Sequence, residues 1–183
     1  KSGNITSGTY KINDNYVTFF YDIHKNDTVR SIAWVSAETE NTKPGFFRTN
    51  ISSAFRDAME EMMVHLINQT RVAEGLNALT YTPAYNPIAR EHSADMIANE
   101  YFGHLDPNGD NARNRLNAGG LTFSYYGENL AYGQYSPIYA HEALMNSEGH
   151  RRNILHADFT HVLVGVDFNT KGVPYFTVNF YKK

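Results

Sequence analysis

The sequence predicts an α+β fold, in which helices come first in the main part of the chain and paired antiparallel strands follow. Between residues 55 and 146, apolar side chains recur at the three- and four-residue spacing of amphipathic helices. Near the C-terminus, two apolar stretches at 162–168 and 175–181 flank a Thr-Lys-Gly turn, which is typical of a β-hairpin. Helices followed by such strands are expected to pack as the layers of an α+β domain.

The first forty residues have a different pattern, which favours strands. Residues 16–23 (YVTFFYDI) and 29–35 (VRSIAWV) are rich in β-branched and aromatic side chains. The segment HKNDT between them suits a hairpin loop, and residues 10–12 can add a short third strand. We therefore predict a small N-terminal β-hairpin segment.

These patterns divide the chain of 183 residues into three parts. Because two or three strands alone are marginally stable in water, we expect residues 1–43 to be the tail of an upstream accessory domain. Residues 44–56, which open with Pro-Gly, are predicted to be a linker. Residues 57–183 then form the main domain, whose length is that of one ordinary domain.

Four helices are predicted around and within the main domain, over residues 55–73, 87–101, 113–118 and 138–146. Ser52 or Ser53 is suited to cap the first helix, and Gly75 is suited to end it. The inner stripe of the second helix is expected to carry Ile88, His92, Asp95 or Met96, and Asn99.

Composition excludes several classes of function. The net charge is -3 and no long basic run occurs, so nucleic-acid binding has no electrostatic support. No apolar stretch approaches the roughly 18 residues of a membrane span. The chain has no cysteine, which excludes thiol catalysis, disulfides and thiolate metal sites. It begins at Lys1 without a signal-peptide pattern, and we take it as a mature or excised fragment.

Two of the eight histidines stand out as candidate functional residues. His104 in FGHLDPNG and His150 in NSEGHRRNIL each follow a glycine in a polar segment, where loops on rigid elements often carry function. A lone inward histidine such as His92 is more typical of a core residue. The remaining histidines are expected to have surface, cap or other non-chemical roles: His24, His65, His141, His156 and His161.

Glu128 in YGENLA is the third candidate, since it also follows a glycine and precedes an apolar run. We expect it to be partly buried, which raises a carboxyl pKa toward neutrality and suits a general base. Spacing alone defines no known site, because HExxH, GxSxG, Walker and dinucleotide motifs are all absent. The residues by themselves indicate an α+β domain with one candidate pocket.

Four motifs in order, FGHLDPNG, YGENLAYG, MNSEGHRRNIL and VGVDF, resemble the bacterial SCP-domain branch of the CAP superfamily. This superfamily comprises cysteine-rich secretory proteins, antigen 5 and pathogenesis-related 1 proteins. The similarity spans about residues 62–180, and residues 65–96 resemble the family's first helix and the approach to its second. The resemblance implies a three-layer α-β-α sandwich with a central antiparallel sheet. The N-terminal strands lie outside it and are similar to the tail of an accessory domain found in some secreted Gram-positive proteins.

The resemblance also implies an open cleft where two histidines and two acidic residues meet. His104 matches the first histidine, Glu128 the acid of the GEN motif and His150 the second histidine. Glu142 and Glu148 both lie in the region of the remaining acid, and Glu142 is favoured because it falls on the helix before the GHR turn. The chain departs from the family pattern at Leu144, where a Trp is usual, and in having no cysteines.

Two functions follow from this resemblance, both at an extracellular or cell-envelope location. The favoured one is a non-catalytic binding module for a lipid-like ligand, an envelope component or a protein. The alternative is a peptidase-like metal-dependent hydrolase, with Zn²⁺ or another divalent metal on His104 and His150 and with Glu128 and Glu142 as catalytic carboxylates. Catalytic zinc sites commonly have three protein ligands, and only two strong ones are evident here, which favours the binding module.

Overall fold

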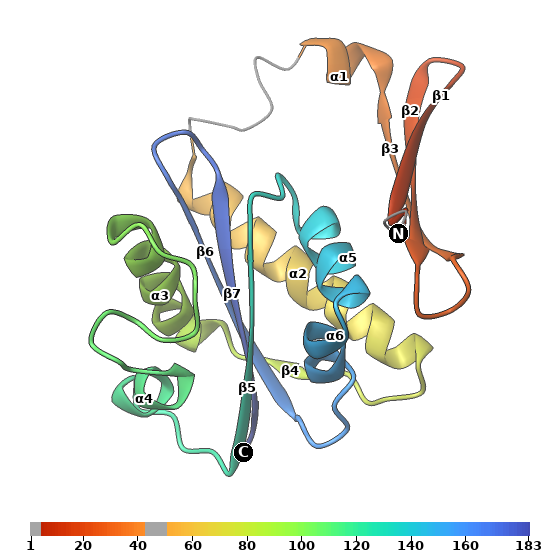
Figure 1. Cartoon of the computed structure of the whole chain (residues 1–183). Helices are drawn as coiled ribbons and strands as arrows, with labels where there is room; N and C mark the ends of the chain where they lie inside the picture. The colour runs from red at the N-terminus through yellow and green to blue at the C-terminus, as the bar shows by residue number, and fades with distance from the viewer. Residues whose placement is uncertain (1–4, 43–50) are drawn as a thin grey trace.

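A four-stranded sheet lies at the centre of the main domain, between two layers of helices, in the computed structural model of Figure 1. The structure describes residues 5–42 and 51–183. Strands β6 (His161–Phe168) and β7 (Pro174–Lys182) form the predicted hairpin, and β5 (Tyr125–Tyr132) pairs antiparallel with β7. The short strand β4 (Thr80–Tyr81) pairs parallel with β6, so the sheet has the order β4-β6-β7-β5.

The two helical layers confirm the expected α-β-α sandwich. One face of the sheet is covered by α2 (Ser53–Ala73), α5 (Pro137–Asn146) and α6 (Glu148–Ile154). The other face is covered by α3 (Asn86–Ala98) and α4 (Ala112–Ala118), which follow the 3₁₀ turn η1 (Pro83–Tyr85). These elements stack as three layers around one apolar core on each face of the sheet.

Side chains along β6 alternate between the two faces of the sheet, so this one strand packs against both helical layers. Val162 and Val164 belong to the cluster that contains Met63 of α2, whereas Leu163 packs in the cluster of Ala89 on α3. Successive side chains of a strand point to opposite faces, so a continuous apolar run buries both.

Gly165 allows α3 to approach the sheet closely. A Cβ at this position would lie 2.1 Å from the Arg90 backbone nitrogen and 2.2 Å from the Ala89 carbonyl carbon. Real atoms do not approach so closely, so the sequence requires glycine where the helix backbone meets the strand.

Helix boundaries largely follow the predictions. Ser52 caps α2 by accepting a hydrogen bond from the Phe55 N–H at 3.1 Å. The α2 helix therefore begins inside the predicted 44–56 linker, most of which lies outside the described residues. In α3, Ser93 is buried and Asn99 is exposed, which corrects the predicted inner stripe at its C-terminal end.

The N-terminal segment forms the expected strands as an antiparallel sheet, β1 (Ser7–Ile12), β2 (Asn15–Asp22) and β3 (Thr28–Ser36), in that order. A short helix that was not predicted, α1 (Ala37–Thr42), follows β3. The sheet lies beside α5 (Figure 1), where the Phe20 ring packs edge-on against Tyr139 with centroids 4.8 Å apart. That this segment belongs to an upstream accessory domain stays a prediction.

None of the helices in the described part of the chain is long and apolar enough to cross a membrane.

Candidate functional site

The structure brings His104 and Glu128 into direct contact. Glu128 lies in the middle of β5, and its side chain is 4% exposed. His104 lies in the segment between α3 and α4, and its side chain is 57% exposed. His104 Nδ1 and Glu128 Oε1 are 2.9 Å apart. A surface imidazole is thus anchored to a buried carboxylate, from residues 24 positions apart.

Two further side chains complete the surroundings of the Glu128 carboxylate. Arg115 of α4 donates from one terminal nitrogen to Oε1 at 3.1 Å and to Oε2 at 2.9 Å. Asn179, the register partner of Glu128 on β7, donates from Nδ2 to Oε2 at 2.9 Å. Both carboxylate oxygens therefore accept more than one hydrogen bond, which is the arrangement that stabilises an ionised carboxylate.

The pKa of Glu128 is lowered, contrary to the expectation of a raised value. Burial raises this pKa, but the hydrogen bond from His104, the charge of Arg115 and the hydrogen bond from Asn179 together outweigh burial. Glu128 is therefore a carboxylate at neutral pH with its lone pairs occupied. It is poorly suited to accept a proton in catalysis, because a useful base has a pKa near the working pH.

Arg115 also holds the segment that carries His104. It donates to the His104 carbonyl oxygen at 3.1 Å and to the Asp110 carbonyl oxygen at 2.8 Å. The Asp106 carboxylate accepts from the backbone N–H groups of Asn108 and Asp110, each at 2.9 Å. The imidazole is thus positioned by its own contact with Glu128 and by an ordered turn.

His150 lies on α6 and not in the turn that was expected around Gly149. Burial lowers its pKa, and the charge of His104 lowers it further. Asn129 of β5 donates to the His150 carbonyl oxygen at 2.9 Å, and this bond ties α6 to the strand of Glu128.

Glu142 is engaged elsewhere, under the N-terminal sheet. Its carboxylate accepts a hydrogen bond from Ser31 Oγ at 2.9 Å and lies 3.3 Å from Arg30 Nε, and both of these residues are on β3. His141 Nδ1 is 3.4 Å from the same carboxylate. Because α5 turns this side chain toward β3, the structure does not bring Glu142 to His104 and Glu128 as the sequence predicted.

Glu148, the other acid considered, is also outside the site. Its side chain is 77% exposed and pairs with Arg152 one helical turn away, at 3.1 Å. Arg115 and Asn179 are the site residues that sequence reasoning missed. A signal was present for Asn179, which is a polar residue within the largely apolar stretch 175–181.

The metal site expected from the sequence would rely on two imidazoles, those of His104 and His150. A metal-bound histidine commonly gives its second ring nitrogen to a carboxylate, as His104 does through Nδ1, which leaves Nε2 available. The pKa of His150 is lowered, which favours the neutral form that binds metals. Within residues 5–42 and 51–183, no group of three or more histidine, aspartate or glutamate side chains is placed to hold a metal ion.

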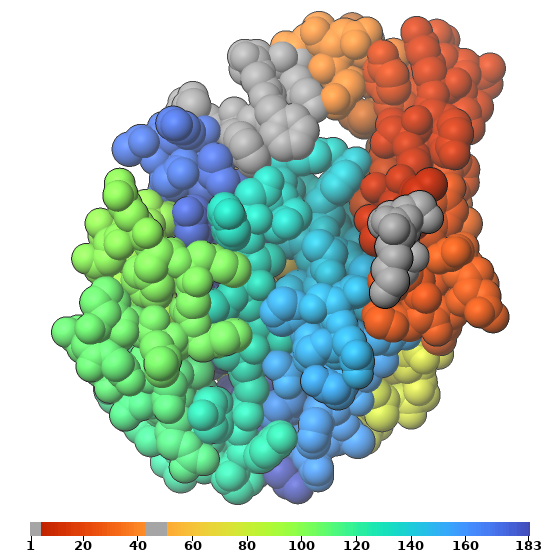
Figure 2. All heavy atoms as spheres, viewed as in Figure 1, coloured from red at the N-terminus to blue at the C-terminus, as the bar shows by residue number. Residues whose placement is uncertain are grey.

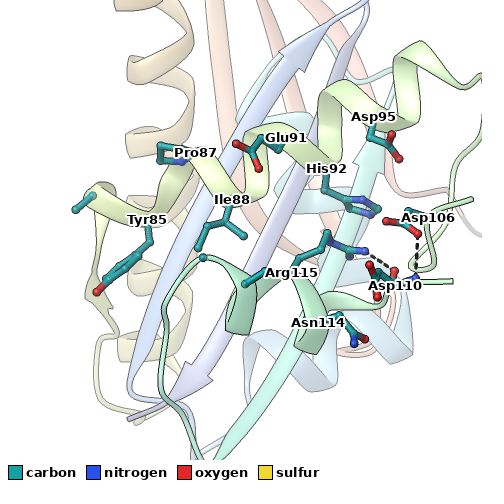
Figure 3. A pocket seen from close by; sticks show the side chains of 13 residues that line it. Tyr85, Pro87, Ile88, Glu91, His92, Asp95, Asp106, Asp110, Asn114 and Arg115 are labelled. Carbon is teal, nitrogen blue, oxygen red and sulfur yellow. Dashed lines mark hydrogen bonds between the residues drawn. The ribbon is translucent and has the colours of Figure 1, made fainter. Parts of the chain in front are cut away.

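A cavity of about 680 Å³ lies next to this site, between α3 and α4 (Figure 3). Arg115 belongs to both, because it contacts Glu128 on one side and lines the cavity with His92 and Asp110 on the other. Figure 2 shows the molecular surface hollowed between the green α3–α4 region and the cyan-to-blue α5–α6 region. The site therefore lies beside open space that can admit a ligand.

Comparison with known proteins assigns the family. The model of the cysteine-rich secretory protein family (CAP) matches residues 64–180. The chain belongs to this family. The match includes all three residues singled out above, His104, Glu128 and His150.

Individual relatives agree with this assignment. The chain is 38% identical over 124 residues to the uncharacterized membrane protein YlbC of Bacillus subtilis (strain 168), covering 68% of this chain and 34% of YlbC. It is 36% identical over 135 residues to the uncharacterized protein YkwD of the same organism, covering 74% of this chain and 50% of YkwD. The CAP chain thus spans half or less of the length of these two relatives.

A solved structure extends the likeness beyond the family match. The crystal structure of an extracellular protein containing an SCP domain from Bacillus anthracis superposes with a TM-score of 0.84 at 25% identity. The alignment covers 97% of this chain and 60% of that one. The N-terminal sheet is therefore included in the shared fold, and not only the CAP domain.

Proposed function

We propose that this chain is an extracellular or cell-envelope binding module whose ligand contacts the surface around His104, Glu128 and His150. The observation that carries the proposal is the occupied carboxylate of Glu128, which accepts hydrogen bonds from His104, Arg115 and Asn179. Such a carboxylate positions its partners and has little capacity to act as a base. The location is supported by the likeness to the extracellular Bacillus anthracis protein.

The exposed imidazole is the group that this network presents to a ligand. Glu128 and Arg115 restrain His104 before any ligand arrives, and such preorganisation lowers the entropic cost of binding. The His104 and His150 rings would hold a divalent cation such as Zn²⁺, which would offer an electrophilic coordination point to a ligand oxygen. A two-residue site of this kind is expected to bind metal weakly.

Hydrolysis at this site would require a general base and a positioned nucleophile. The lowered pKa of Glu128 argues against it as the base. Glu142, the other carboxylate considered, contacts Arg30 and Ser31 of the N-terminal sheet. The binding module is therefore the function that the geometry supports best.

Calorimetric titration with Zn²⁺ tests the metal part of the proposal. Wild-type protein is expected to bind Zn²⁺, and His104→Ala is expected to lose nearly all of that binding. His65→Ala is the matched control, because His65 is a 75% exposed histidine on α2. Equal binding by wild type and His104→Ala contradicts the metal proposal.

A peptide-library digest tests the alternative. The binding module predicts no turnover above background with or without Zn²⁺. Robust cleavage that Glu128→Gln abolishes would overturn the proposal in favour of the hydrolase.

A further inference from the structure

A second cavity lies where the N-terminal sheet meets the CAP domain, close to α5. Its volume is about 650 Å³, within the range typical of small-molecule sites. Both parts of the chain contribute to its wall, which includes Thr9, Tyr16, Thr18, Gln134, Tyr135 and Tyr139. Neither His104 nor Glu128 lines it, so this cavity is separate from the site described above.

Gln134 has an unused acceptor in this wall. Its Oε1 is buried and has no hydrogen-bond partner among the described residues. A buried amide oxygen without a donor is costly, so proteins normally supply a partner from the chain, from water or from a ligand. Gln134 lines the cavity, but this oxygen itself has almost no exposed surface, so a ligand donor reaches it only when the amide turns toward the cavity.

Tyrosine rings make up much of the remaining wall. The Tyr135 and Tyr139 rings are in contact, with centroids 4.5 Å apart, and Tyr16 contributes a third ring from β2. Aromatic rings offer flat apolar faces together with a polar hydroxyl. They suit a ligand that has C–H faces as well as hydroxyl groups.

A chain of hydroxyl groups runs along the same wall. Thr9 Oγ1 and Thr18 Oγ1 are 2.8 Å apart, and Thr18 Oγ1 is 3.2 Å from the Tyr139 hydroxyl. Such groups both donate and accept, so they match the hydroxyls of a ligand. Among the described residues that line the cavity there is no lysine, arginine or histidine, and the one charged residue is Glu40. An anionic ligand therefore finds no cationic partner among these residues.

We propose that this cavity binds a neutral saccharide. The tyrosine rings would pack against the C–H faces of the sugar, and the Gln134 amide would turn into the cavity so that Oε1 accepts a hydrogen bond from a hydroxyl or an acetamido N–H. The saccharide would contact the N-terminal sheet and the CAP domain together. The proposal does not depend on the function of the His104 site.

Calorimetric titration of the whole chain with tetra-N-acetylchitotetraose, and separately with maltotetraose, tests this inference. Wild type is expected to bind at least one sugar. Gln134→Leu and Tyr16→Ala are each expected to weaken binding about tenfold, the size of one lost hydrogen bond or ring contact. Gln69→Leu, on the exposed surface of α2, is the matched control and should bind like wild type. His104→Ala should also bind like wild type.

Thermal unfolding of the sugar-free Gln134→Leu variant provides a second readout. Because leucine removes an unpaired buried acceptor, its midpoint is expected to equal or exceed that of wild type. A clearly lower midpoint would show that Oε1 is already satisfied without a ligand, and the inference would fail. It would equally fail if neither sugar bound wild type at millimolar concentration, or if binding were lost in His104→Ala instead of Gln134→Leu.

Discussion

Two buried glutamates of this CAP domain, Glu128 and Glu142, have almost equal exposure but opposite surroundings. Each side chain is 4% exposed, and each lies near histidine and arginine. Both carboxylate oxygens of Glu128 accept hydrogen bonds in good geometry. One of the donors is His104, whose side chain reaches the surface. Glu142 is covered by β3, and its Oε2 lies near Arg30 without a partner in hydrogen-bond geometry.

The difference shows that a buried acid next to a histidine does not by itself indicate a functional site. His141 beside Glu142 is 2% exposed and cannot meet a ligand, whereas His104 beside Glu128 is 57% exposed. The Glu142 region also contains Asp22, which pairs with Arg30 and with Arg151 at 3.0 Å. This buried ion cluster joins the N-terminal sheet to α5 and α6, and we assign it a structural role.

The largest effect on stability is expected from Glu142→Ala. Removal of one member of a buried ion cluster should lower the free energy of unfolding by about 3 kcal/mol. This is the low end of the range for breaking buried ion pairs, because Arg30 is still paired with Asp22 in the variant. Chemical denaturation measures this, and zinc calorimetry on the folded variant should show unchanged affinity. A loss of zinc affinity as large as that of His104→Ala would place Glu142 in the functional site.

A double variant separates packing from charge in the same region. Replacing the pair with apolar groups, as Arg30→Met with Glu142→Leu, should restore most of the stability lost in Glu142→Ala. If the double variant is less stable than Glu142→Ala, the cluster contributes more than paired charge.

Glu128→Gln is expected to have a smaller effect on stability and a larger one on binding. The amide keeps one acceptor, but Arg115 and His104 lose their anionic partner, for a cost of about 2 kcal/mol. Zinc affinity should fall about tenfold, the effect usual for a carboxylate behind a metal-bound histidine. Full zinc affinity in Glu128→Gln would show that the carboxylate does not orient His104.

The region of Glu128 also has a pH signature, because burial lowers the pKa of His92 below its ordinary value of 6.5. The folded protein then binds this proton less readily than the unfolded chain. The neutral His92 ring therefore makes its full contribution to the free energy of unfolding above pH 6.5. This contribution is lost as the pH falls below 6.5. Denaturation between about pH 7 and pH 5 should show a weaker pH dependence in His92→Gln than in wild type. Identical dependence in both proteins would contradict the burial argument.

The smallest effect is expected from Glu148→Ala. Its ion pair with Arg152 is exposed on both sides, and such pairs contribute less than about 0.5 kcal/mol. Both the unfolding midpoint and zinc affinity should match wild type. A large change in zinc affinity would make Glu148 the missing acid of the site.

Local signals in the sequence were sufficient for most of the fold. The apolar spacing of α2 was predicted, and its cap, Ser52, was one of the two serines considered for that position. The hairpin between β6 and β7, whose turn uses Gly172 at φ 75°, was predicted as well. The helix α6 was missed because Gly149 is typical of a turn. Tertiary contacts support this helix, including the hydrogen bond of Asn153 to the Glu128 carbonyl oxygen at 3.1 Å.

The site was predicted less completely because its chemistry depends on contacts distant in sequence. Burial of Glu128 was predicted correctly, yet the direction of its pKa depends on Arg115 and Asn179, which are 13 and 51 residues away. Glu142 was chosen from its position on a helix before the GHR segment. That position did not reveal that β3, more than 100 residues earlier, faces the carboxylate.

An anomalous-scattering map of a zinc-soaked crystal tests the central claim most directly. We expect one zinc peak bonded to ring nitrogens of both His104 and His150, with the Glu128 carboxylate still paired to Arg115, and no peak at Glu142. Imidazoles too far apart to share one ion, or a zinc peak bonded to Glu142, would contradict it.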